Sequence, residues 1–180
     1  MGYSCGKEIQ YHTEKLCAEN VGLVQQFVCG NESIDKYLRV NAVEDTSVVT
    51  YLYVEDETKK VLGFASICCS GIVCKYEKTC VMHPSIEIKY FAVSSEIQHL
   101  PFDDKPTKDR YCISDQFFCE LLKRCCEISE EHIGASHITL YSVPSAHGFY
   151  KRNLMADYEK YMTKESYSFI DGCIPMFMPL

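Results

Sequence analysis

Two runs of strand-forming residues with a short polar turn between them constrain the fold of this chain most. The runs are Ser47–Glu55 (SVVTYLYVE) and Val61–Tyr76 (VLGFASICCSGIVCKY), and the five residues DETKK separate them. β-Branched and aromatic residues favour strands, and a short polar segment favours a turn. We therefore expect an antiparallel hairpin over 47–76.

The remaining apolar segments predict further strands and three helices. Asn31 is a candidate N-cap for an early amphipathic helix, and Ser114 is one for the helix with the clearest apolar spacing. Pro144 fits the first turn of a short third helix. Strands are expected near 8–12 and over 85–93, 135–143 and 174–180. The expected order is β, α, β, β, β, α, β, α, β, which is an α+β fold.

Length and composition favour one soluble domain over residues 1–180. The chain has 47% apolar and 24% charged residues, which is ordinary globular usage. No apolar run is long enough for a membrane span, and the first residues lack a signal peptide, so we expect a cytoplasmic protein. A net charge of −7 argues against a surface that grips nucleic acid broadly.

The cysteines favour a reduced, metal-free protein. There are 12 of them, but the chain contains neither C-x-x-C nor H-x-x-x-H, and metal sites usually need such paired ligands. Buried or half-buried thiols are the favoured interpretation. A thiol-based redox sensor, suggested by the adjacent pairs Cys68–Cys69 and Cys125–Cys126, is the weakest functional hypothesis.

Three places in the sequence could carry chemistry, and two of them have an ordinary structural alternative. Glu87 lies between two isoleucines, so it is either a desolvated carboxylate suited to act as a base or an edge-strand residue in water. Backbone N–H groups at residues 110–115 precede the longest expected helix and could bind phosphate. Tyr150 is either a reactive group or one of many core aromatics, and His147 is either a base or an exposed residue.

Four ordered segments give the chain a resemblance to the GNAT superfamily of acyl-CoA-dependent N-acyltransferases. FVCGNESIDKYLRVNA resembles the F-x-C-G-x-x-x-L-D-x-F-L-x-x-x-A opening of the branch that includes toxin-like acetyltransferases. VLGFASI resembles the strand that follows that opening, and EIKYFAVSS resembles the central strand. SAHGFYKRNLM is similar to the N-x-x-A-x-x-F-Y-x-x-x-G-F signature.

The resemblance implies a fold, a reaction and a set of site residues. The fold is a central mixed, mostly antiparallel sheet flanked by helices, and the cofactor is acetyl-CoA as acyl donor. Glu87 falls where histone-type members have their general base, and Tyr150 falls on the tyrosine that protonates the departing CoA thiolate. The cofactor-binding residues implied are Phe91, Ala92 and Val93 on the central strand, with Arg110, Tyr111, Cys112, Ile113, Ser114 and Asp115 at the following helix.

The sequence departs from the family in the segment that should bind the pyrophosphate. Cys112, Ile113 and Ser114 stand where the motif Q/R-x-x-G-x-G/A has its glycines, and glycine allows the backbone to approach a phosphate closely. Two functions therefore compete: an N-acetyltransferase, and a non-catalytic GNAT-fold module that binds a ligand or protein. The expected acceptor is a small-molecule or protein amine, while aminoacyl-tRNA, a homodimer and an antitoxin-like partner stay open.

Overall fold

The computed structural model describes residues 9–101, 111–164 and 172–180. Its contacts group the chain into two compact units. The first unit comprises Met1–Ser66 and Tyr90–Glu120, and the second comprises Ile67–Lys89 and Leu121–Leu180. The chain passes between the units within two strands and one helix. That residues 1–180 act as one domain stays a prediction.

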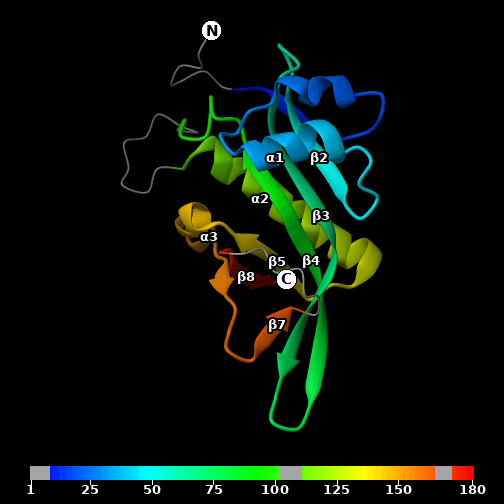
Figure 1. Ribbon diagram of the computed structural model, residues 1–180, viewed down its shortest axis with the longest axis vertical. Coiled ribbons are helices and arrows are strands. Elements are labelled where there is room, and N and C mark those ends of the chain that lie inside the picture. The colour runs from blue at the N-terminus through cyan, green and yellow to red at the C-terminus, as the bar shows by residue number, and fades with distance from the viewer. Residues whose placement is uncertain (1–8, 102–110, 165–171) are drawn as a thin grey trace. The chain divides into compact units, whose positions relative to one another are not determined.

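The strands form a mixed, mostly antiparallel sheet. Their hydrogen-bonded order is β1-β2-β3-β4-β5-β8-β6, and β7 pairs with β3. The long strands β3 and β4 form the hairpin that is easiest to follow in Figure 1. β4 and β5 run parallel, whereas β1 with β2 and β5 with β8 run antiparallel. The strand bounds are β1 Tyr11–Lys15, β2 Val49–Glu55, β3 Val61–Lys75, β4 Cys80–Val93, β5 His137–Ser142, β6 Ala156–Asp157, β7 Met162–Lys164 and β8 Ile174–Pro179.

The helical segments are short apart from one. The exception is α2, Ile113–Ile128; the others are the 3-10 helices η1 Val21–Gln26 and η4 Pro144–Ala146, the π-type turns η2 Tyr37–Asn41 and η3 Ser129–Ile133, and the α-helices α1 Glu32–Lys36 and α3 His147–Arg152. None of the helices within the described residues has the length and hydropathy that crossing a membrane requires.

Of the two N-caps predicted from the sequence, Asn31 is confirmed and Ser114 is wrong. The Asn31 side chain accepts hydrogen bonds from the N–H groups of Ser33 and Ile34, as an N-cap should. α2 instead begins at Ile113, so Ser114 lies in its first turn and is not the cap. The Asp115 carboxylate accepts the Cys112 N–H at 2.9 Å, and this contact fixes the earlier start.

The first unit is built around two apolar clusters on opposite sides of its strands. One contains Phe27, Leu38 and Phe64, and the other contains Tyr53 and Phe117. Tyr53 stacks on Phe117 with ring centroids 4.4 Å apart, and its hydroxyl donates to the Phe117 carbonyl at 2.9 Å. These contacts fasten the start of α2 to β2.

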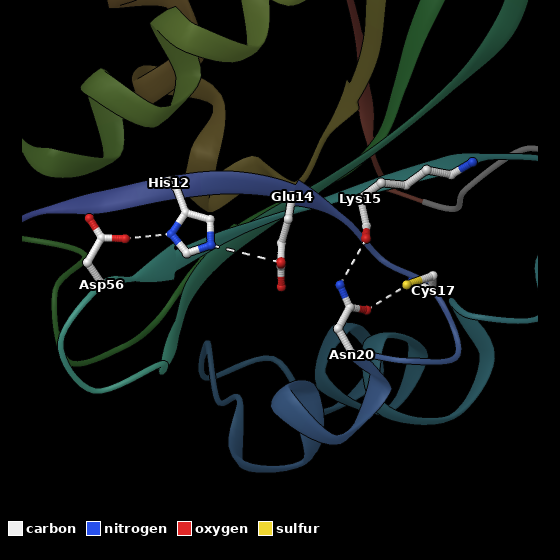
Figure 2. A network of polar contacts seen from close by, with 6 residues as sticks. All are labelled: His12, Glu14, Lys15, Cys17, Asn20 and Asp56. Atoms are coloured by element: carbon white, nitrogen blue, oxygen red, sulfur yellow. Dashed lines mark hydrogen bonds and ion pairs between the residues drawn. The ribbon is translucent and has the colours of Figure 1, made fainter.

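Polar contacts hold the turn that follows β1 (Figure 2). The Asn20 side chain donates to the Lys15 carbonyl at 2.9 Å and accepts the Cys17 N–H at 2.8 Å. His12 contacts Asp56 at 2.5 Å, which joins β1 to the turn after β2. β1 spans Tyr11–Lys15, so it overlaps only the end of the strand that was expected near 8–12. Residue 8 lies outside the described residues.

In the second unit, buried apolar residues alternate with polar residues along the paired strands β4 and β5. Ile86 and Ile88 of β4, and Ile138 and Leu140 of β5, are all buried and point to one face. Polar residues occupy the positions between them, so the opposite face of these strands is polar. The short strands β6 and β7 were not expected from the sequence.

Candidate functional site

The parallel pairing of β4 and β5 stops before either strand ends. The ladder runs from Ser85 opposite His137 to Ile88 opposite Leu140, and within the described residues it has no further pairs. β4 nevertheless continues to Val93 and β5 to Ser142. The backbone of an extended strand can pair with a ligand that lies along it like an added strand.

The three predicted cofactor residues on β4 have side chains that belong to the core. Ala92 and Val93 are buried in different clusters of the first unit, as the alternation of a strand requires. Phe91 packs against the second cluster, with its ring 5.2 Å from that of Phe118. These residues could therefore hold a ligand only through backbone groups.

The N–H groups at the start of α2 already have partners inside the protein. The Cys112 N–H donates to Asp115 at 2.9 Å, the Ile113 N–H to the Leu100 carbonyl at 3.1 Å, and the Asp115 N–H to the Cys112 carbonyl at 3.0 Å. The Ser114 hydroxyl donates to the Gln98 carbonyl at 3.4 Å.

Charge at this helix start also opposes a bound phosphate. Asp115 is only 2% exposed, and its carboxylate occupies the positive end of the helix dipole, where an anion would bind. Tyr111 is exposed and its hydroxyl donates to Gln116 at 3.3 Å. Residues 112, 113 and 115 as they stand do not fit a diphosphate, and Arg110 lies outside the described residues.

Glu87 is a buried residue of a central strand. It is 6% exposed, and β4 lies between β3 and β5 in the sheet. The Ser70 hydroxyl of β3 donates to a Glu87 carboxylate oxygen at 2.8 Å. The alternative, a Glu87 on an edge strand that points into water, is therefore wrong, because β4 has a neighbouring strand on each side.

Two tyrosines lie in the electrostatic field of Glu87. Burial and then the charge of Glu87 raise the pKa of Tyr141 to about 12. Burial, Tyr141 and Glu87 together raise the pKa of Tyr158 further above its ordinary value. Both phenols are neutral at physiological pH. Sequence alternation through ASHITLYSV could have placed Tyr141 on this face, whereas no local signal points to Tyr158 or Ser70.

Tyr150 is buried in the second unit, while its neighbour Phe149 is only half-buried. Tyr150 is 8% exposed, and its carbonyl accepts the N–H groups of Asn153 and Met155. Burial raises the pKa of the Tyr150 phenol well above its usual value. Phe149 meets the Tyr150 ring edge to face at 5.1 Å and has Arg152 5.0 Å from its centroid.

His147, the other candidate of this segment, is hydrogen-bonded to an acidic side chain. Its Nε2 atom lies 2.7 Å from Asp157, and Lys151 lies 3.5 Å from the same carboxylate. The hydrogen bond from His147, followed by the charge of Lys151, outweighs slight desolvation and lowers the pKa of Asp157. This arrangement ties α3 to β6 and favours a structural role for His147.

A separate pocket of about 310 Å³ lies in the first unit. Its lining includes Lys59 and Lys60, and Lys60 is paired with Glu96 at 3.4 Å. The lining of this pocket comprises Gly22, Leu23, Gln26, Phe27, Thr58, Lys59, Lys60, Val61, Leu62, Ser94 and Glu96.

No metal site is found within residues 9–101, 111–164 and 172–180. In those ranges no three His, Cys, Asp or Glu side chains lie close enough together to hold a metal ion.

Comparison with solved structures identifies the fold of the chain. The sequence matches no protein-family profile and no curated protein. Solved structures do match: "Crystal structure of bacterial toxin" has a TM-score of 0.72 at 15% identity, with 95% of this chain and 91% of that chain covered. The chain has the GNAT fold.

Two further similar structures are complexes with ligands. A tyrosine-to-phenylalanine mutant of the AtaT toxin, bound to the C-terminus of the antitoxin AtaR and acetyl-CoA, has a TM-score of 0.66 at 15% identity over 94% of this chain and 92% of that one. AtaT complexed with acetyl-methionyl-tRNAfMet has a TM-score of 0.69 at 17% identity over 94% and 95%. At such identities the likeness establishes the GNAT fold and confirms the sequence resemblance at that level.

The candidate residues divide between the two units. Phe91, Ala92, Val93 and the start of α2 belong to the first unit, where Val93 and Ile113 share a cluster. Glu87 and Tyr150 belong to the second unit. The roles assigned to all of them stay predictions.

Proposed function

We propose that the protein is an acetyl-CoA-dependent N-acetyltransferase that joins an acetyl group to an amine by direct attack in a ternary complex. The observation that carries the proposal is the end of the β4–β5 ladder at Ile88 and Leu140, while both strands continue. A GNAT-fold structure described with acetyl-CoA supports the choice of cofactor.

In this proposal acetyl-CoA supplies the acetyl group as a thioester. Backbone groups of Phe91, Ala92 and Val93 hold the extended part of the cofactor, and a backbone N–H there polarises the thioester carbonyl. The diphosphate end is assigned to Arg110, Tyr111, Cys112, Ile113, Ser114 and Asp115. Since several N–H groups of that segment have internal partners, this part of the proposal requires the segment to rearrange.

Two buried groups of the second unit supply the proton transfers. Glu87 takes a proton from the attacking amine as the new N–C bond forms. Tyr150 gives its phenolic proton to the departing sulfur as the C–S bond breaks. Tyr150 is protonated at neutral pH, because burial raises the pKa of its phenol above an ordinary value that already exceeds 7.

The acceptor is an amine, carried by a small molecule or a protein. The net charge of −7 disfavours a broad nucleic-acid interface. The structure of AtaT with acetyl-methionyl-tRNAfMet makes aminoacyl-tRNA a second acceptor class to assay, and the antitoxin-bound AtaT structure makes a protein partner worth seeking.

The proposal is tested by calorimetry and by two matched variants. Acetyl-CoA should bind the full chain, and no heat of binding at millimolar acetyl-CoA would refute the proposal. Tyr150→Phe should lower turnover at least about tenfold with nearly unchanged acetyl-CoA affinity. Tyr161→Phe changes an exposed tyrosine of the same unit and should retain full activity. Equal rates for both variants would remove Tyr150 from the acid role.

A non-catalytic GNAT-fold module is the second candidate function. The occupied N–H groups and the buried Asp115 carboxylate at the start of α2 favour it, because they oppose a diphosphate. It predicts that Lys108 and Arg110 contact no phosphate. A cofactor-bound crystal structure with an ordered diphosphate at residues 110–115 would rule it out.

A further inference from the structure

One face of the second unit gathers polar and aromatic side chains around Glu87. Glu87 is paired in register with Thr139 of β5, which in turn faces Phe177 of β8. Tyr141 is two residues beyond Thr139 and therefore projects from the same face. These positions alternate with the buried isoleucines, so the polar face is opposite the apolar one.

Tyr158 joins this face from outside the central strands. Its N–H donates to the Pro175 carbonyl at 3.0 Å, and Pro175 is the register partner of Tyr141. Its ring meets Phe177 edge to face with centroids 6.0 Å apart. Tyr141 and Tyr158 are both only half-buried, so an approaching molecule can reach them.

We propose that this face receives the acceptor, and that Glu87, Tyr141 and Tyr158 select a primary amine arriving as an ammonium ion without a carboxylate on the same carbon. The inference rests on the proposed transferase function and names its acceptor class. Tyr141 and Tyr158 are specificity-determining residues here, whereas Ser70 is a positioning residue that holds the Glu87 carboxylate at 2.8 Å.

Charge and ring chemistry both favour a cation at this place. A carboxylate attracts an ammonium ion, and the face of a tyrosine ring attracts it further by its quadrupole. The phenols stay neutral at physiological pH, since burial and Glu87 raise their pKa values, so they add no negative charge. The first ammonium proton passes to Glu87 and on to water, which leaves the neutral amine and the carboxylate that the transfer needs.

The charge of Glu87 also disfavours an acceptor that has a carboxylate beside its amine. An acid group on the carbon that bears the amine would be placed beside Glu87, and like charges brought together in a protein site repel strongly. The overall charge of −7 acts in the same sense. Free α-amino acids should therefore bind poorly, although their amines are chemically competent.

The test uses three small probes and requires no turnover. The probes are butylammonium, its neutral counterpart butanol, and norvaline, which is butylamine with a carboxylate on the amine-bearing carbon. The full chain carries ring-¹³C tyrosine, and its NMR signals for Tyr141 and Tyr158 are assigned from the Tyr141→Phe and Tyr158→Phe variants. Titrations are run at pH 7 and constant ionic strength.

Butylammonium should shift both signals saturably, and butanol and norvaline should bind at least about tenfold more weakly. Glu87→Gln, which keeps the side-chain shape, should weaken butylammonium by a similar factor. Glu131→Gln changes an exposed acid of the same unit and should have no effect. Equal shifts from butanol, no shifts from butylammonium, or an unchanged affinity in Glu87→Gln would each overturn the inference.

A kinetic arm separates the inference from the proposed function. With acetyl-CoA and butylamine, Tyr158→Leu should raise KM for the amine about tenfold while kcat changes little. Its far-UV circular dichroism should match that of the parent chain. An unchanged KM in the folded variant would refute selection by Tyr158. If acetyl-CoA fails to bind but butylammonium still shifts the signals, the transferase proposal fails and the amine site stands.

Discussion

Replacing Asp115 with Asn should strengthen acetyl-CoA binding while weakening the fold slightly. The carboxylate is 2% exposed and accepts the Cys112 N–H at 2.9 Å in the first turn of α2. Asn retains an oxygen that can accept the same hydrogen bond, so the substitution removes the charge and keeps the shape. If the diphosphate binds here, it meets one negative charge fewer.

The two effects can be estimated from the position of the group. Loss of a negative charge in the first turn of a helix costs about 0.3–1 kcal/mol of stability. A unit charge about 8 Å from another contributes about 0.5 kcal/mol at the dielectric constant of water and about 2 kcal/mol at an effective value near 20. Acetyl-CoA affinity should therefore rise between about twofold and about thirtyfold.

Calorimetric titration of acetyl-CoA at low and high salt measures the affinity change, and thermal unfolding without ligand measures the stability change. The gain in affinity should shrink at high salt because salt screens partly exposed charges. Glu120→Gln is the matched control: it removes an acid of the same helix that the Tyr11 hydroxyl contacts. An Asp115→Asn affinity equal to that of the parent chain would place the diphosphate elsewhere.

Three substitutions and one labelling experiment test the surroundings of the site and the core. Gly63→Ala should destabilise the chain by about 1–3 kcal/mol and weaken acetyl-CoA binding, because the added Cβ would lie 3.0 Å from the Ala92 carbonyl oxygen. Gly148→Ala meets nothing within 4 Å; it should leave acetyl-CoA binding unchanged in calorimetry and, because alanine favours a helix over glycine, raise the stability in urea unfolding by up to about 1 kcal/mol. Because burial raises the pKa of Tyr141 to about 12, its stabilising contribution is present below pH 10 and lost between about pH 10 and 12; Tyr141→Phe should flatten the stability curve there. The pKa of the Cys125 thiol is raised to about 12, so alkylation at pH 8 followed by mass spectrometry should leave it unmodified in the folded chain.

The strand and helix pattern is largely predictable because it depends on local chemistry. The hairpin over 47–76 is confirmed as β2 and β3, and β8 occupies most of the expected last strand. The polar segment Asp56–Lys60 could only be a turn between two apolar runs. β6 and β7 are two and three residues long, and their pairing depends on partners far away in sequence, so no local pattern marks them.

The site is less predictable because its determinants are long-range. The spacing around Glu87 is equally compatible with a central or an edge strand, and only the pairing with β3 and β5 decides between them. The contact with Ser70 spans a hairpin. Similarly, the absence of glycine at residues 112–114 indicates an altered cofactor site, but not that Asp115 fills the helix start.

Burial of Tyr150 works against its proposed role as the acid. It raises the pKa of the phenol, which makes the phenol a weaker acid. A thiol is ordinarily a stronger acid than a phenol, so burial makes proton donation to the departing sulfur less favourable. Glu87 accepts the Ser70 hydroxyl at 2.8 Å, so a neighbouring strand orients the proposed base before the amine arrives.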